Sequence, residues 1–314
     1  MKISSKMKRT FFVISVALMA IAIHAQLLWK VTGPALQKPS YLFGTMHFEH
    51  GDFIDSVAGL NDVIHSVETC YLEIESSQMS SPETMTMLAQ RSLAPQDSTL
   101  DQLLSPEDLK IVESVINKHF ANMVNIETFK PLKPAATLQA IVAMQAMKDL
   151  KNFDMGEEKI DAAVESQARR CGHAISSLET VEFQADLLLG APLTQQAAEL
   201  LEFCKADGEV EVKLKALIEA YEKQDLDKIL EYLYDPAMGG GGNDLERLLF
   251  NRNRNWVKTL VPAMERQSVL VSVGAGHLPT EQGLIQLLRN QGLTVEAVKA
   301  EEKGNQTLNT KDDE

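Results

Sequence analysis

Segments with the composition of β-strands lie near both ends of this sequence, and a long stretch with helical patterning separates them. Short apolar or aromatic runs typical of strands occupy Leu27–Val31, Tyr41–Phe43, Cys70–Ile74, Ala174–Ser177, Val269–Val273 and Thr294–Val298. A sheet must cover its apolar faces with other elements, so we expect the two ends of the chain to share one sheet. The sequence therefore predicts an α/β fold of the mixed α+β type, with a central mixed β-sheet built from the N- and C-terminal segments and flanked by helices.

The helical middle is expected to cover that sheet and to supply a helical insertion. Pro82–Gly190 is mostly helical in pattern, Pro192–Tyr234 predicts two or three amphipathic helices, and a long helix is expected from about Asn243 to Arg266. The first two strands are expected to pair as a hairpin. The last two, joined by a helix over Glu281–Asn290, are expected to form a right-handed parallel crossover.

Residues 1–25 have the layout of a secretory signal peptide. Four basic residues are followed by an apolar run from Phe11 to Ile23, and Ala25 offers a cleavage position. The run is shorter than the about 20 apolar residues that span a bilayer, so no stable membrane span is expected after cleavage. The sequence thus predicts a secreted or periplasmic protein, with one domain over residues 26–300 and a disordered polar tail over residues 301–314.

The chain is acidic and contains few cysteines. Its formal net charge is −14, and such a surface repels phosphate backbones, which argues against nucleic acid as a partner. Cys70, Cys171 and Cys204 are too few and too far apart for a structural zinc site. One pair could close as a disulfide in an oxidising compartment, but the favoured interpretation is three small buried apolar residues.

Two segments repeat the same order of a strand, a glycine, two further residues and a histidine. They are Tyr41–His47, which ends Gly-Thr-Met-His, and Val271–His277, which ends Gly-Ala-Gly-His. Glycine lets a backbone turn where a strand ends, and open α/β folds bind ligands beyond the carboxyl ends of their strands. A lone histidine beside a strand is more often structural, but the shared context of His47 and His277 favours a common site for one metal ion or one substrate.

Two acidic residues, Glu73 and Glu75, close the strand predicted from Cys70. In an extended chain their side chains face the same way. Carboxylates are seldom buried without a partner. Either both are solvated at the end of the strand, or one is a metal ligand and the other a general base or a group that orients a ligand. The sequence leaves both interpretations open.

Arg252 lies within the apolar stripe of the helix predicted over Asn243–Arg266. A guanidinium keeps its charge, so in that position it needs an anionic partner. The partner could be an acid of this chain such as Glu179, in a structural ion pair. It could equally be a substrate carboxylate or a developing oxyanion.

Four blocks of the sequence resemble the TraB/GumN family, which also includes the animal TIKI proteins. In the order of the family, the blocks are Leu28–Val31 with Tyr41–His47, Leu72–Glu75, Leu178–Gln184 preceded by Asp161 and Gly172, and Arg252–Trp256 with Val273–Pro279 and Gly283-Leu284. The resemblance spans about Leu27 to Val298 and is far more specific than any one block. Glu75 departs from the family by standing where aspartate is commoner, and His173 by standing where lysine is frequent.

The resemblance implies a mixed sheet flanked by helices, akin to erythromycin-esterase-like and ChaN-like folds. For TIKI-like members it implies metal-dependent proteolysis with Mn²⁺ or Co²⁺. It also implies that His47 and His277 are the paired histidines of the site and that Glu73 is the acid at the metal. Glu179 and Arg252 would be supporting charged residues.

The leading hypothesis is an exported metal-dependent hydrolase that acts on peptides. Its ion would be held by His47, Glu73 and His277. Imidazole and carboxylate ligands suit Mn²⁺, Co²⁺ or Zn²⁺, and such an ion would polarise the carbonyl and activate a water molecule. Glu75 or Glu179 would accept the proton, and Arg252 would stabilise the oxyanion.

Two other functions use the same pocket. One is a binding protein that captures a peptide or another extracellular ligand without cleaving it, as pheromone-silencing relatives would. The other is the capture of a metal ion or haem, by analogy with the ChaN-like fold. A fold alone does not decide among these functions.

Overall fold

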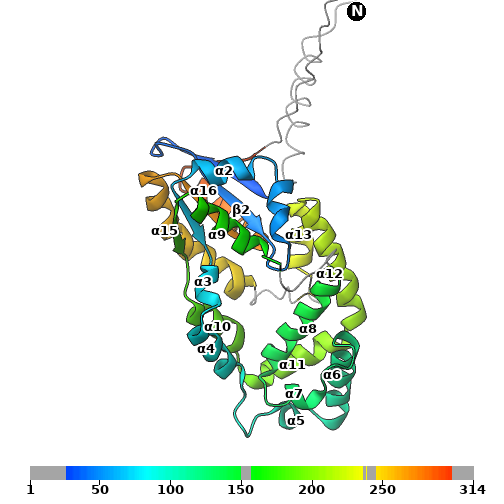
Figure 1. Ribbon diagram of the computed structural model, residues 1–314. Helices are drawn as coiled ribbons and strands as arrows, with labels where there is room; N and C mark the ends of the chain where they lie inside the picture. The colour runs from blue at the N-terminus through cyan, green and yellow to red at the C-terminus, as the bar shows by residue number, and fades with distance from the viewer. Residues whose placement is uncertain (1–25, 150–156, 236–237, 239–244, 299–314) are drawn as a thin grey trace, which may run out of the picture.

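The computed structural model describes residues 26–149, 157–235, 238 and 245–298. The predicted signal peptide (1–25) and the predicted tail (301–314) lie outside the described residues. A sheet with its covering helices forms one end of the molecule in Figure 1, and a group of helices forms the other. This second group comprises α5 (Leu100–Leu103), α6 (Pro106–His119), α7 (Ile126–Phe129), α8 (Pro134–Asp149) and α11 (Leu193–Lys205).

The described strands form one mixed sheet in the order β4-β3-β5-β2-β1-β6. Their bounds are β1 (Leu28–Thr32), β2 (Ser40–Thr45), β3 (Thr69–Leu72), β4 (Ala174–Ser177), β5 (Val269–Gly274) and β6 (Thr294–Ala297). Strands β4, β3, β5 and β2 are parallel neighbours, whereas β1 pairs antiparallel with both β2 and β6. The predicted mixed sheet built from both ends of the chain is confirmed, as is the antiparallel pairing of the first two strands.

Strands β5 and β6, joined through α16 (Leu284–Asn290), run in the same direction, as the crossover prediction requires. They are not neighbours, however, because the β1–β2 hairpin lies between them. The position of the hairpin depends on pairings between distant segments, which local sequence patterns do not report.

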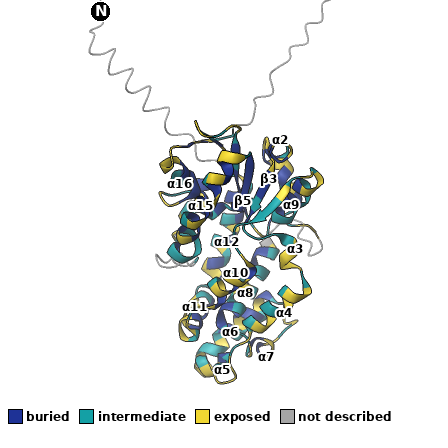
Figure 2. Cartoon of the chain, turned by 90° about the vertical axis from the view of Figure 1, so that its left-hand side faces the viewer, coloured by how far each residue is buried: buried dark blue, intermediate teal, exposed yellow. Residues whose placement is uncertain are grey.

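Helices cover both faces of the sheet. Figure 2 shows α15 (Asn251–Arg266) and α16 on one side and α2 (Leu60–Ser66) and α9 (Ile160–Arg170) on the other. Apolar residues of the inner strands, such as Phe43, Cys70 and Val271, are fully buried between these layers. Complete burial of β5 explains why its sequence is apolar from Val269 through Val271 rather than alternating.

The helical insertion has an apolar core of its own. Val112 and Ile116 of α6 pack there with Ile141 of α8 and Leu200 of α11, and all four are fully buried. The remaining elements are the 3₁₀ turns η1 (Gly51–Ser56) and η4 (Ala275–His277), the π-helix η3 (Glu246–Phe250), and α3 (Ser76–Met79), α4 (Pro82–Ser92), α10 (Val181–Leu189), α12 (Asp207–Glu222) and α13 (Leu226–Leu233).

The three cysteines are free. Cys70 and Cys204 are buried, as the favoured interpretation predicts, whereas Cys171 is partly exposed. Burial raises the pKa of both buried thiols to about 12, so they remain protonated and unreactive. Within the described residues, no helix combines the length and the apolar composition needed to cross a bilayer.

A buried hydrogen bond joins α12 to the sheet. Tyr221 of α12 is almost fully buried, and its hydroxyl donates to the carbonyl of Gly44 in β2 at 2.9 Å. We expect Tyr221→Phe to lower the free energy of unfolding by about 1–3 kcal/mol, because a buried carbonyl loses its donor. Tyr234→Phe, at an exposed position, should change it by less than about 0.5 kcal/mol. Equal urea midpoints for the two variants would contradict this role.

Candidate functional site

The loops that follow the four parallel strands carry most of the residues predicted from the sequence. His47 lies two residues after β2, Glu73 one residue after β3, Glu179 two residues after β4, and His277 at the end of η4, which follows β5. Parallel strands in register deliver these loops to the same edge of the sheet. Arg252 reaches this edge from the first turn of α15.

The glycines of the two repeated segments permit close packing at this edge. The segments lie side by side, with Gly44 of β2 paired to Val273 of β5. A Cβ at Gly44 would lie 3.0 Å from Cα of Ala275, so a side chain would force β2 and η4 apart. Gly274 anchors Glu73, because its N–H donates to Oε1 of Glu73 at 2.8 Å. The repeated pattern therefore reflects packing and anchoring as well as chemistry.

Arg252 is buried, and all five of its N–H groups have acceptors. Its Nε and Nη2 each donate to Glu179 at 2.8 Å, and Nη2 also donates to Glu73 at 2.5 Å. The two N–H groups of Nη1 reach the carbonyl of Leu248 at 2.8 Å and Nε2 of His277 at 3.1 Å. The ion pair with Glu179 considered from the sequence is therefore present, and Glu73 is a second carboxylate partner.

The two carboxylates are held together from several sides. Backbone pairing continues past the strand ends, because the N–H of Glu179 donates to the carbonyl of Glu73 at 3.0 Å. The side-chain amide of Gln184 donates to both carboxylates at 3.1 Å, and Nε1 of Trp256 donates to Glu179 at 3.0 Å. Burial raises the pKa of Glu73, but the surrounding positive charge and the donated N–H groups outweigh it and lower that pKa to about 2. Glu73 is therefore ionised at neutral pH.

His277 is a buried neutral imidazole of defined tautomer. Its Nδ1 lies 2.6 Å from Oδ1 of Asn253, whose amide group donates to the carbonyls of His277 and Gln282. The Asn253 oxygen must therefore accept, which places the ring proton on Nδ1 and leaves Nε2 to accept from Arg252. Burial, followed by the charge of Arg252, lowers the pKa of His277 to about 3.

His47 has the opposite environment. Its side chain is 63% exposed, and Nδ1 lies 2.8 Å from Oδ2 of Asp161. The other oxygen of Asp161 accepts from Oγ1 of Thr45 at 2.7 Å. The charge of Asp161 raises the pKa of His47 to about 9. Asp161 was not among the predicted site residues; its place in the family resemblance is the sequence signal that could have identified it.

Arg252, Glu73, Glu179 and His277 form one hydrogen-bonded cluster, and Glu75 lies outside it. Strand β3 ends at Leu72 and the chain then bends, so the expectation that Glu73 and Glu75 share one face is wrong. The carboxylate of Glu75 pairs instead with Arg169 of α9 at 2.6 Å, at the start of α3. A bend directly after a strand breaks the two-residue alternation on which that expectation rested.

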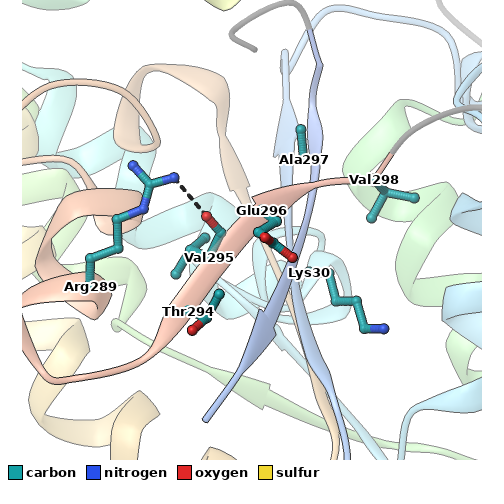
Figure 3. A pocket seen from close by; sticks show the side chains of 7 residues that line it. All are labelled: Lys30, Arg289, Thr294, Val295, Glu296, Ala297 and Val298. Carbon is teal, nitrogen blue, oxygen red and sulfur yellow. Dashed lines mark hydrogen bonds between the residues drawn. The ribbon is translucent and has the colours of Figure 1, made fainter. Parts of the chain in front are cut away.

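A cavity of about 300 Å³ opens beside the cluster. His47, Glu73, Arg252 and His277 are among its polar lining residues, and an apolar wall completes it. A larger hollow of about 820 Å³ lies beside the edge strand β6. Figure 3 shows its lining, in which Arg289 donates to the carbonyl of Val295. The larger hollow contains none of the residues predicted to be functional, so we assign the candidate site to the smaller cavity.

The predicted metal ligands have suitable donor types, but the lone pair of His277 is already in use. Nε2 of His277 faces Oε1 of Glu73 at 3.7 Å, yet it accepts from Arg252. An imidazole nitrogen has one lone pair and cannot also bind a metal ion. Among the described residues, no three His, Cys, Asp or Glu side chains converge as ligands. In this arrangement the residues do not fit an ion unless Arg252 first releases His277.

The two histidines should titrate at opposite ends of the pH scale. We expect ¹⁵N NMR to show His277 as the neutral Nδ1–H tautomer above about pH 4, and His47 to titrate near pH 9. Because the pKa of His47 rises on folding, the stability from its pair with Asp161 is present below about pH 6.5 and is lost through pH 9. Asp161→Asn should return the His47 pKa toward 6.5, and a normal titration of His277 near pH 6.5 would contradict the assignment.

Comparison with known proteins identifies the family. No curated protein and no solved structure matches the chain. The model of the TraB/PrgY/gumN family matches residues 27–297, a span that includes every strand of the sheet and every residue of the cluster. The chain therefore belongs to the TraB/PrgY/gumN family.

Proposed function

We propose that this protein is an exported hydrolase that cleaves peptide bonds in the smaller cavity, with His47 as the residue that transfers the proton. The observation that carries the proposal is the contrast between His47 and the groups around it. Arg252 and His277 are buried, Glu73 and Glu179 are largely buried, and hydrogen bonds to Arg252 connect them. His47 lines the cavity, is 63% exposed, and has its ring orientation set by Asp161.

A histidine whose Nδ1 is fixed by a carboxylate can transfer protons through Nε2. Nε2 of His47 makes no hydrogen bond to any described residue, so it is available to a water molecule or a substrate. Neutral His47 would take a proton from a water molecule as that water attacks the peptide carbonyl. It would then return the proton to the departing amine. The buried cluster would hold the floor of the cavity rigid during both steps.

Metal dependence stays a prediction of the family resemblance. A divalent ion, when bound, would polarise the carbonyl and lower the pKa of its water molecule. His47, Glu73 and His277 are the residues that would hold it. To bind an ion, His47 must be neutral and Arg252 must move away from His277. The ion and the hydrogen bond from Arg252 to His277 therefore exclude each other.

Cleavage by the purified protein tests the proposal. We expect products from an unbiased peptide library analysed by mass spectrometry, and we expect His47→Gln to lower kcat/KM by about 10²–10⁴-fold because proton transfer is lost. His65→Gln, at an exposed position on α2, is the matched control and should leave the rate unchanged. Parallel assays with EDTA and with added Mn²⁺, Co²⁺ or Zn²⁺ test the metal dependence.

Two outcomes would overturn the proposal. Cleavage by His47→Gln at the wild-type rate would show that His47 does not transfer the proton. Recovery of every peptide intact under all metal conditions would favour a protein that binds its ligand without cleaving it.

The rate should depend on pH in the direction set by His47. Only neutral His47 accepts a proton, so kcat/KM should rise with pH and level off near pH 9. Asp161→Asn should move the inflection toward pH 6.5 because it removes the charge that raises the pKa, even if the plateau falls. A flat profile between pH 6 and 9, or an inflection that Asp161→Asn does not move, would contradict this role.

A further inference from the structure

We infer that the apolar wall of the smaller cavity is a specificity subsite for an uncharged apolar side chain next to the bond that is cleaved. The inference rests on the proposed function and names the substrate class for the same site. The wall comes from the loop after β2, from α12 and α13, and from the π-helix η3. Its principal residues are Phe48, Leu217, Ile229, Leu233, Leu248 and Leu249.

Four of these side chains keep apolar surface free in the cavity. Leu217 and Leu233 pack against the main core on one side but remain only partly buried, and Leu248 and Leu249 are likewise half-buried. All four line the cavity. Apolar surface that the protein's own core leaves uncovered in a concave site is the usual feature of a ligand pocket.

The charges of Arg252 and Glu73 are already satisfied within the protein. All five N–H groups of Arg252 have acceptors among the described residues, so its guanidinium has no donor left for a substrate carboxylate. Glu73 accepts from Arg252, Gln184 and Gly274, so it is a poor partner for a substrate cation. A charged substrate side chain against the apolar wall would lose its hydration without gaining Arg252 or Glu73 as a partner, which is unfavourable.

The apolar wall adjoins both the polar floor of the cavity and the turn that carries His47. A Cβ at Gly276 would lie 3.2 and 3.3 Å from the two methyl groups of Leu233 and 3.8 Å from a methyl of Leu249. Gly276 immediately precedes His277 in η4. Phe48, in the same wall, directly follows His47 in the chain, so an apolar group on this wall lies next to the cleaved bond rather than at a distant subsite. A volume of about 300 Å³ accommodates one side chain the size of leucine, methionine or phenylalanine with adjoining backbone.

The substrate series uses the unmodified protein. Peptides cleaved by the wild-type protein should have Leu, Met or Phe on one side of the cleaved bond. Replacement of that residue by Ala should lower kcat/KM about tenfold, and replacement by Asp or Lys at least 100-fold. Equal rates for peptides with Leu and Asp at that position would overturn the inference, whether or not any variant folds.

Variants of the wall provide the matched comparison. Leu233→Asp and Leu249→Asp place a charge in the cavity, whereas Val212→Asp places one on an exposed position of α12. We expect the first two to abolish the preference for apolar residues and Val212→Asp to retain it, with folding checked by circular dichroism. Retention of the preference by both wall variants would overturn the assignment.

A binding measurement separates this inference from the proposed function. If no peptide is cleaved, hydrolysis fails but the subsite is still testable with N-phenyl-1-naphthylamine, an uncharged apolar fluorophore. We expect saturable binding to the wild-type protein, at least tenfold weaker binding to Leu233→Asp, and unchanged binding to Val212→Asp. Equal affinity for all three proteins, or no saturable binding to the wild type, would overturn the subsite.

Discussion

The buried guanidinium of Arg252 is the interaction on which the rest of the site depends. A charge removed from water is costly unless ionic and hydrogen-bonding partners surround it. Here two carboxylates, a carbonyl and an imidazole accept all five N–H groups, and the ring of Trp256 lies 4.8 Å away. Loss of Arg252 would leave both carboxylates without their counter-charge, at a cost of about 3–5 kcal/mol. The polar floor of the cavity is therefore also part of what holds the fold together.

Sequence reasoning predicted the parts of this arrangement that follow from strand topology and helix periodicity. Parallel strands deliver the residues after their carboxyl ends to one edge, and this places His47, Glu73 and His277 close together. The helical period placed Arg252 on a buried face, and its permanent charge required an acid. Both inferences needed only local patterns and one rule of topology, which is why the mixed sheet and most of the cluster could be predicted.

The remainder depends on contacts between segments far apart in sequence. Asp161 reaches His47 from α9, and Asn253 sets the tautomer of His277 across 24 positions of sequence. Neither pairing leaves a local periodic signal. The prediction for Glu75 failed for a different reason. It assumed that the chain stays extended to Glu75, whereas β3 ends at Leu72. The sequence also could not show that Nε2 of His277 accepts a hydrogen bond from Arg252, because that contact forms only when the chain folds.

The sheet edge contributes the polar part of the cavity, and the helices contribute its apolar part. The loops after the parallel strands supply ionisable groups that are fixed by the buried ion cluster, and α12 and α13 supply an apolar wall. The two parts are connected at β2, where Tyr221 of α12 donates to Gly44 three residues before His47. A shift of α12 would therefore disturb the turn that carries His47 together with the wall opposite it. Because substitutions in the wall change only apolar contacts, whereas substitutions in the floor expose a buried charge, substrate preference can vary in this fold at a smaller cost in stability than the reacting groups can.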